Sequence, residues 1–214
     1  MAESTKERIL AQALRLFSQS GFDAVSVEQI AAAVGIKAPS LYKHYKSKQA
    51  IFEALFEEAR RRYSDYTLGI SVHLTDAERD TEHFTQITQG ALADKVKQLV
   101  EFSLRDEFVS GFRRMLTVEQ FRSSELAALY TKRYVTMLVD YHAELFKQLI
   151  AAGTLCDRGA QQMALMYVAP VIVLVGVCDR QPEREQECMG LIDAHVKLFF
   201  ETYNIPFNTK NTGE

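Results

Sequence analysis

The clearest hydrophobic pattern of this chain lies in its first quarter, within residues 26–48. Apolar side chains there recur at i, i+3, i+4 and i+7, at Val27, Ile30, Ala31 and Val34. This spacing predicts one buried face of a short helix. Ser26 precedes the helix and has Gln29 three residues later, which is the spacing of a capping box. Gly35 follows the last apolar position, where a helix commonly ends with a residue at positive φ.

A second short helix is predicted directly after this turn. Pro39 stands where the first turn of a helix tolerates a missing N–H. Leu41 and Tyr45 are four residues apart and are expected to face inward. The side chains left outside are Ser40, Tyr42, Lys43 and His44. Ser47 is a suitable cap for a further helix that begins near Lys48.

Two short helices joined by a glycine turn predict a helix-turn-helix, whose second helix enters the major groove of DNA. The outward Ser40, Lys43 and His44 offer donors to phosphates and base edges, and Tyr42 adds a flat ring. Lys48, at the start of the next helix, suits a phosphate.

The order GIKAPSLYKHYKSK, with RILAQALRLFSQSGFDAVSV before it, resembles the TetR family of bacterial transcriptional regulators over residues 4–56. The resemblance implies a three-helix DNA-binding domain joined to a larger helical ligand-binding and dimerisation domain. By position it implies DNA contacts at Ser26, Lys37, Ala38, Pro39, Ser40, Tyr42, His44 and Lys48. Lys37 departs from the family, which usually has a Ser or Thr at this position. Lysine cannot cap a helix, so this position is not expected to supply a side-chain cap.

The remaining chain predicts an all-α fold. Ser4 and Glu7 form a second capping box that opens a helix reaching Ser20. We expect a helix from Lys48 to about Leu68, a loop over residues 69–90, and helices from there to Tyr203, including one long helix over 123–152. The predicted domains are residues 1–47 for DNA binding, 48–204 for ligand binding and dimerisation, and 205–214 as a tail.

Met163 to Cys178 is a run of sixteen residues without a charge. It falls short of the roughly 18–20 apolar residues that cross a bilayer, so no membrane partner is expected. A helix that is apolar all round must be buried on every side. We therefore expect this helix and the last one, from about Pro182, to pair with their symmetry mates in a homodimer.

The net charge of −3 by itself disfavours nucleic acid as a binding partner, but the distribution of the charge favours it. Residues 1–62 hold ten Lys and Arg against seven Asp and Glu, whereas residues 63–214 hold fifteen against twenty-one. Positive charge is therefore concentrated in the helix-turn-helix segment, which favours DNA as its partner.

No catalytic or metal-binding motif occurs in the chain. Asp140, His142 and Glu144 alternate within a helix, so they do not share a face. We therefore expect no enzyme activity, no cofactor and no metal site. The three cysteines fit no metal spacing and favour reduced thiols in the cytoplasm, with a redox-sensing pair as the alternative. Residues 1–6 are polar, so no signal peptide is expected.

The family resemblance further implies a small-molecule effector, and the methionines and tyrosines favour an apolar or aromatic one. The candidate lining residues are Phe102, Phe112, Met115, Leu116, Tyr134, Met137, Leu138, Tyr141, Met166 and Tyr167. Arg113, Glu119 or His142 could supply a polar contact. Together these features predict a repressor that binds a double-stranded DNA operator and is released by its effector. The alternative is a helical dimer that binds another protein and uses the helix-turn-helix only structurally.

Overall fold

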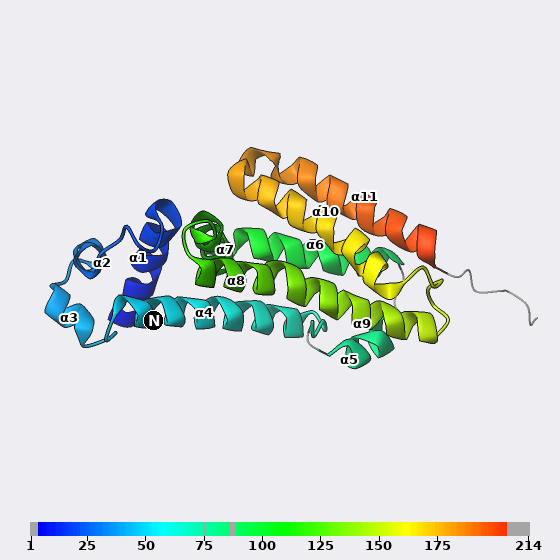
Figure 1. Ribbon diagram of the computed structural model, residues 1–214, viewed down its shortest axis with the longest axis horizontal. Helices are drawn as coiled ribbons and strands as arrows, with labels where there is room; N and C mark the ends of the chain where they lie inside the picture. Colours follow the sequence, from blue (N-terminus) through cyan, green and yellow to red (C-terminus); the bar gives the residue numbers. More distant parts are fainter. Residues whose placement is uncertain (1–3, 75, 86–88, 205–214) are drawn as a thin grey trace, which may run out of the picture. The chain divides into compact units, whose positions relative to one another are not determined.

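The computed structural model describes residues 4–74, 76–85 and 89–204. Every regular element within them is helical, in the order drawn in Figure 1. The elements are α1 (Thr5–Ser20), α2 (Val27–Val34), α3 (Ala38–Tyr42), α4 (Lys48–Gly69), α5 (Ala77–Phe84), α6 (Gln89–Arg105), α7 (Glu107–Glu119), α8 (Ser124–Thr131), η1 (Lys132–Thr136), α9 (Met137–Ala151), α10 (Ala160–Arg180), η2 (Pro182–Arg184) and α11 (Glu185–Tyr203). The all-α fold class predicted from the sequence is confirmed.

The chain divides into two compact units. The first comprises Met1–Gly69 and Glu101–Arg133, and the second comprises Ile70–Val100 and Tyr134–Glu214. Helix α7 therefore forms one unit with the helix-turn-helix, although it lies far away in the sequence. The domain boundary predicted after residue 47 stays a prediction, and the predicted tail over 205–214 lies outside the described residues.

In the first unit, α1 packs against α2, α4 and α7, and α4 also packs against α7. A row of aromatic rings runs through these contacts. The ring centroids of Phe17 and Phe22 are 5.2 Å apart, those of Phe22 and Phe52 are 5.3 Å apart, and those of Phe52 and Phe112 are 5.6 Å apart. Tilted and edge-on rings at these separations contribute about 0.5–1.5 kcal/mol per pair beyond the area they bury.

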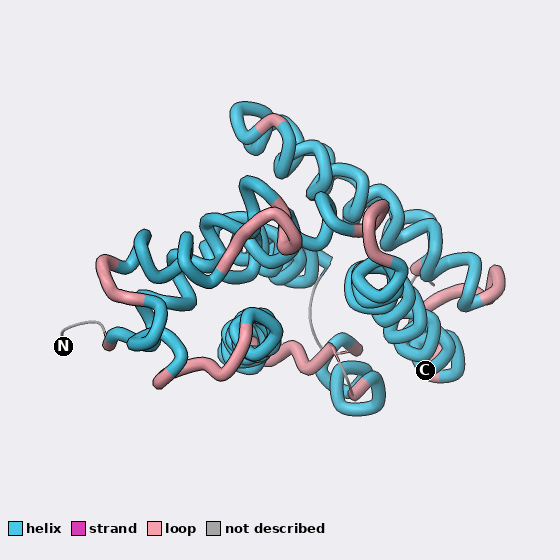
Figure 2. The backbone as a smooth tube through the Cα atoms, turned by 60° about the vertical axis from the view of Figure 1, so that its left-hand side comes forward, coloured by secondary structure: helices cyan, strands magenta, loops and turns pink. Residues whose placement is uncertain are grey.

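In the second unit, α9 packs against α5 and α10, and α10 packs against α11. Helices α10 and α11 lie side by side and run in opposite directions (Figures 1 and 2). The rings of Phe146 and Phe199 stack at 5.2 Å, and Tyr167 lies 4.9 Å from Phe199, so aromatic contacts join α9, α10 and α11.

The loop predicted over residues 69–90 is wrong in part, because it contains α5. Asp76 caps this helix by accepting a hydrogen bond from the backbone N–H of Arg79 at 3.1 Å. The inward side chain of α5 is a carboxylate, Asp80, which is 0% exposed. A polar residue on the buried face leaves no apolar periodicity, so the pattern of hydrophobic residues did not indicate a helix.

The single long helix predicted over residues 123–152 is also wrong in part. A π-helical turn, Lys132–Thr136, separates α8 from α9. Such turns insert one extra residue and occur mostly as single turns within α-helices, frequently at functional sites. The predicted ends are confirmed, since the Ser123 side chain caps α8 and Gly153 ends α9 at a φ of 73°.

The apolar run around Met163–Cys178 forms α10, which is only partly buried within this chain. Val173 is 62% exposed and Met166 is 56% exposed, and on α11 Leu198 is 62% exposed. By length and composition alone, α10 is long and apolar enough to cross a membrane. Its packing against α9 and α11 instead favours the predicted role as a helix of a bundle. One apolar face of α10 stays exposed in the single chain.

Candidate nucleic-acid interface

Helix α2 forms as its sequence predicts. The Ser26 side chain accepts from the N–H of Gln29 at 3.2 Å, and the Gln29 side chain accepts from the N–H of Ser26 at 2.7 Å. This reciprocal pair satisfies two of the orphan donors at the helix start. Gly35 has a φ of 80°, in the left-handed region that glycine adopts without a Cβ penalty. The turn between the two short helices is therefore fixed by local chemistry.

Helix α3 presents the polar surface expected of a recognition helix. Leu41 and Tyr45 are buried, as the spacing predicted. The exposed candidates for DNA contact are Ser26, Lys37, Pro39, Tyr42, Lys43 and His44, and the half-buried ones are Ala38, Ser40 and Lys48. Lys37 occupies the N-cap position with no side-chain cap bond, as its residue type predicted.

Arg8 and Tyr45 support the helix-turn-helix from its inner side. Arg8 of α1 donates from Nη2 to the carbonyl oxygen of Val34 at 2.5 Å, which satisfies a free carbonyl at the end of α2. Burial, with a smaller contribution from the Glu58 carboxylate, raises the pKa of the Tyr45 hydroxyl to about 12. Tyr45 is therefore a neutral core residue that supports α3 from behind.

Lys48 is held within the protein. Its Nζ donates to the carbonyl oxygen of Phe22 at 2.9 Å and lies 3.4 Å from that of Asp23. It also sits 4.4 Å from the centroid of the Phe22 ring, which is a cation–π contact. These contacts give Lys48 a structural role in the α1–α2 turn, and its contact with a DNA phosphate stays a prediction.

The sequence reasoning missed the role of Glu119 in this unit. Glu119 is the last residue of α7 and is 0% exposed. Its Oε1 accepts a hydrogen bond from the backbone N–H of Phe22 at 3.0 Å. A buried glutamate among apolar residues signals a specific partner, but the sequence did not say that this partner is a backbone group 97 residues away.

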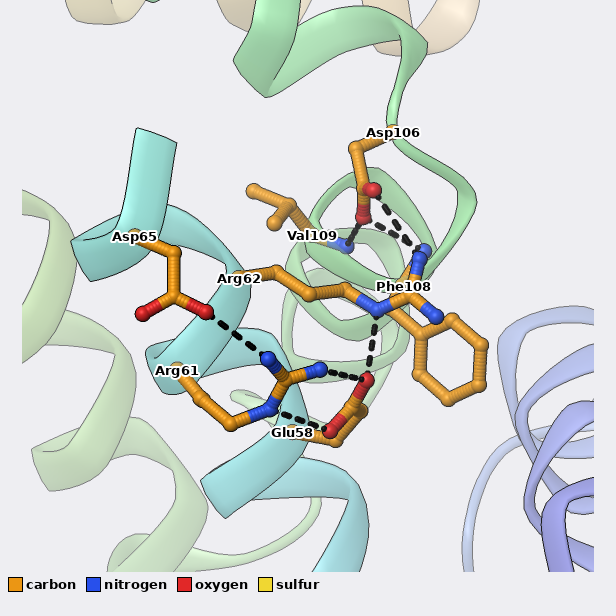
Figure 3. A network of polar contacts seen from close by, with 7 residues as sticks. All are labelled: Glu58, Arg61, Arg62, Asp65, Asp106, Phe108 and Val109. Atoms are coloured by element: carbon orange, nitrogen blue, oxygen red, sulfur yellow. Dashed lines mark hydrogen bonds and ion pairs between the residues drawn. The ribbon is translucent and has the colours of Figure 1, made fainter. Parts of the chain in front are cut away.

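An ion-pair network joins α4 to the start of α7 (Figure 3). Arg62 donates from Nε to Glu58 at 2.7 Å and from Nη1 to Asp106 at 3.1 Å. The same carboxylate of Asp106 caps α7 by accepting from the N–H groups of Phe108 and Val109. The Arg62 side chain is 35% exposed and links the two helices through these carboxylates.

The other arginines of this run stay near the surface. Arg61 pairs with Glu58 and with Asp65, as Figure 3 shows, and its side chain is 58% exposed. Hydrogen bonds from Arg61 lower the pKa of Glu58 and outweigh the opposing effect of burial. The Glu58 carboxylate is thus held charged between two guanidinium groups.

Four of the candidate effector residues lie in the first unit. Phe112, Met115 and Leu116 are at most 2% exposed and belong to the core of α7. Phe102 is half-buried and stacks on Tyr66, with ring centroids 4.0 Å apart. Arg113, proposed as a polar contact, is 4% exposed and donates to the carbonyl and hydroxyl oxygens of Ser103 at 2.9 and 2.7 Å.

The other six candidates lie in the second unit. Tyr141 and Tyr167 are buried, Tyr134 and Leu138 are half-buried, and Met137 and Met166 are exposed. Tyr141 donates its hydroxyl to Asp80 at 2.5 Å, and Asp80 also accepts from the backbone N–H groups of His73 and Leu74. His73 belongs to the same cluster, because its side chain is 15% exposed and its Nδ1 lies 2.8 Å from Asp80.

His142 is enclosed in the aromatic core of the second unit. Its Nδ1 donates to the carbonyl oxygen of Leu138 at 2.7 Å, and its ring lies 5.0 Å from those of Tyr141 and Tyr167. Burial lowers the pKa of His142 to about 4, so the ring is neutral at pH 7. Among the described residues, no three His, Cys, Asp or Glu side chains are grouped to hold a metal ion.

Residues 4–69 thus form an all-α segment that contains a helix-turn-helix. Residues 9–55 match the family described as "Bacterial regulatory proteins, tetR family". The resemblance indicated by the sequence is therefore confirmed for this segment.

Two kinds of relative extend this result. The tetracycline repressor protein class D of Escherichia coli is 37% identical over 68 residues, which are 32% of this chain and 31% of that repressor. The chain thus spans about a third of the length of this relative. A TetR-family transcriptional regulator from Mesorhizobium loti has a similar fold, with a TM-score of 0.66 at 19% identity over 94% of this chain and 97% of that one.

The repressor of the Stenotrophomonas maltophilia multidrug efflux pump, SmeT, also has a TM-score of 0.66, at 17% identity over 96% of this chain and 93% of SmeT. At sequence identities this low, the similarity to these two structures shows the fold alone. The predicted architecture, an N-terminal helix-turn-helix with a larger helical part after it, is therefore confirmed.

Proposed function

We propose that this chain is a DNA-binding transcriptional regulator that acts as a repressor. The observation that carries the proposal is the short helix α3, whose polar side chains face outward while Leu41 and Tyr45 anchor it. This is the geometry of a recognition helix in the major groove. The proposal assigns phosphate contacts to Tyr42 and Lys48, and base-edge contacts to Lys37 and Ser40.

We propose further that the chain works as a homodimer in the cytoplasm, without catalytic activity. The exposed apolar residues of α10 and α11 support a dimer. Leu165 and Val173 on α10 and Leu191 on α11 are exposed, and burying them against a second copy would stabilise the pair. A two-fold dimer places two recognition helices on a palindromic operator, with half-site centres about 34–36 Å apart or at a multiple of that distance.

The proposed effector is a small apolar or aromatic molecule that releases the operator. SmeT has been solved in complex with triclosan, a precedent from a protein of similar fold. Coupling of about 1.4 kcal/mol is enough for a tenfold loss of operator affinity. Reciprocity requires that operator DNA weaken effector binding by the same factor, so calorimetric titration of triclosan with and without operator tests release by this compound.

The decisive experiment for DNA binding is selection of duplexes from a random pool by the purified protein. We expect a palindromic sequence whose affinity falls steeply as salt rises, because phosphate contacts release counterions. Enrichment of no sequence, together with weak binding that does not depend on salt, would favour the alternative of a helical protein-interaction dimer whose helix-turn-helix is only structural.

A further inference from the structure

The backbone of Phe22, in the turn between α1 and α2, is held from two sides. Its N–H donates to Glu119 Oε1 of α7 at 3.0 Å, and its carbonyl oxygen accepts from Lys48 Nζ of α4 at 2.9 Å. Its ring packs between those of Phe17 and Phe52. A single residue thus ties the turn that leads into the helix-turn-helix to both α4 and α7.

The Glu119 carboxylate is an unusual group for such a contact. It is 0% exposed, and its Oε2 has no hydrogen-bond partner. Arg122 Nη1 lies 3.5 Å from Oε1, and the Arg122 side chain is 59% exposed. Burying a carboxylate with so few partners costs free energy, and a well-packed apolar residue would stabilise the fold better. Stability alone therefore does not account for this carboxylate.

Gly21 is matched to Glu119 by shape. Its φ is +88°, and a Cβ built at this position would lie 1.9 Å from Glu119 Oε1. A Cβ at residue 21 would take the place of the carboxylate oxygen that accepts from the Phe22 N–H. The two positions, far apart in sequence, thus form one close-fitting contact.

Helix α7 is also fixed to α4 along its length. Asp106, at its start, binds Arg62 of α4 (Figure 3), and Phe112 packs against Phe52 and Phe56 at 5.6 and 5.7 Å. A helix held at its start and middle by α4, and at its end by Glu119 to the α1–α2 turn, can carry a displacement from one end to the other. Contacts of this kind have discrete packed arrangements and do not deform smoothly.

We propose that Glu119 is a positioning residue that makes the placement of the helix-turn-helix depend on the placement of α7. The proposal rests on the proposed DNA-binding function for its biological meaning. When α7 shifts, the carboxylate moves the Phe22 peptide, and Ser26 and α2 follow it. Without Glu119, the Phe22 peptide keeps its hydrogen bond from Lys48 but loses its hydrogen bond to α7.

The experiment compares Glu119→Ala and Glu119→Gln with the wild type. Glutamine retains an oxygen that can accept from the Phe22 N–H, whereas alanine does not. Glu125→Ala is the matched control, because Glu125 is an exposed carboxylate on α8. Hydrogen exchange measured by mass spectrometry follows peptides over residues 21–45, and peptides over α4 and α7 report general loosening of the unit.

We expect Glu119→Ala to speed exchange over residues 21–45 at least tenfold, with little change in α4 and α7. Glu119→Gln should restore most of the protection, and Glu125→Ala should resemble the wild type. An equal increase in all three segments would overturn the proposal, because it would mean that Glu119 only stabilises the unit. The same holds if the segment over 21–45 keeps its wild-type protection.

A second measurement uses the duplex that the wild-type protein selects from a random pool, with a scrambled duplex beside it. We expect Glu119→Ala to lose at least tenfold in affinity for the selected duplex and little for the scrambled one. Equal losses on both would count against positioning. If the wild type selects no duplex, the proposed function fails, and the exchange pattern alone then decides the role of Glu119.

If Glu119→Ala does not fold, Gly21→Ala keeps the proposal testable. The added methyl would collide with Oε1 and displace the carboxylate from Phe22. We expect fast exchange confined to residues 21–45. Wild-type exchange in Gly21→Ala would overturn the proposal.

Discussion

The Nζ of Lys48 donates to the carbonyl oxygen of Phe22 at 2.9 Å, so the first residue of α4 holds the turn between α1 and α2. An ammonium has three N–H donors, and this contact leaves others for a phosphate. Lys48 can therefore stabilise the domain and bind DNA at the same time. Its substitution should show both effects, and they can be separated by their dependence on salt.

We predict that Lys48→Ala lowers both thermal stability and affinity for every duplex. The loss of stability follows from the broken contacts with Phe22, and the loss of affinity follows from one missing phosphate contact. The slope of log affinity against log salt should fall by about one. Lys46→Ala, at an exposed neighbouring lysine, controls for general loss of positive charge. Weaker binding with an unchanged salt slope would mean that Lys48 acts through the turn alone.

Substitutions at Lys37 and Ser40 are predicted to change sequence preference. Both lie at the start of α3, whose N-terminal residues reach base edges in a helix-turn-helix. A lost base contact typically costs about 1–3 kcal/mol at one position of the half-site. Selection from a random pool with Ser40→Ala and Lys37→Ala should therefore yield altered half-sites. Unchanged half-sites with uniformly weaker binding would assign these residues to the DNA backbone.

Sequence reasoning was sufficient where the structure depends on local chemistry. The Ser26 capping box, the Gly35 turn and the inward Leu41 all follow from residues within a few positions of one another. A cap, a left-handed glycine and a 3.6-residue period are decided locally, so they can be predicted from one sequence.

The same reasoning failed where one distant partner decides the structure. Glu119 appeared as a possible ligand contact, but it binds the Phe22 backbone. Asp80 lay in a predicted loop, but it is buried because Tyr141 and the backbone of His73 satisfy its oxygens. Buried polar residues need hydrogen-bond partners from distant parts of the chain, and no periodic pattern in the sequence predicts those partners.

The Asp80 cluster predicts a measurable pH dependence of stability. Burial raises the pKa of Asp80, but hydrogen bonds from Tyr141 and His73 outweigh it, so the pKa lies below its ordinary value. A carboxyl group whose pKa is lowered by folding stabilises the native state above its unfolded pKa of about 3.9. That contribution is lost as the pH falls through the lower folded pKa. Acidification should therefore remove the stabilisation that the Asp80 hydrogen bonds supply.

We expect Tyr141→Phe to lower the free energy of unfolding by about 1.5–3 kcal/mol at pH 7, the range for a hydrogen bond to a charged group. The difference from the wild type should narrow as the pH falls through the lowered folded pKa of Asp80, where the carboxylate becomes protonated. Urea unfolding at several pH values measures this. Tyr203→Phe is the control, because the Tyr203 hydroxyl donates to an uncharged group, the sulfur of Met166, at 3.8 Å. A difference that stays constant to pH 2 would exclude the Asp80 charge as its cause.

The open apolar face of α10 predicts how the chain associates. Val173 is 62% exposed in a single chain, so Val173→Glu should leave the monomer fold intact. In a dimer through α10 and α11 the same glutamate would be buried without a partner, at a cost of several kcal/mol. We therefore expect the wild type to sediment as a dimer at micromolar concentration and Val173→Glu to sediment as a monomer with the same helical content.

The matched control is Val118→Glu, which introduces the same charge at a valine of α7 that is 38% exposed. If the seam lies on α10 and α11, Val118→Glu should remain dimeric, and Val173→Glu should also bind a palindromic duplex far more weakly than the wild type. The second effect follows because two half-sites joined through one dimer are bound with a high effective concentration that a monomer lacks. A wild-type protein that is monomeric at micromolar concentration, or a Val173→Glu variant that stays dimeric, would contradict this interface.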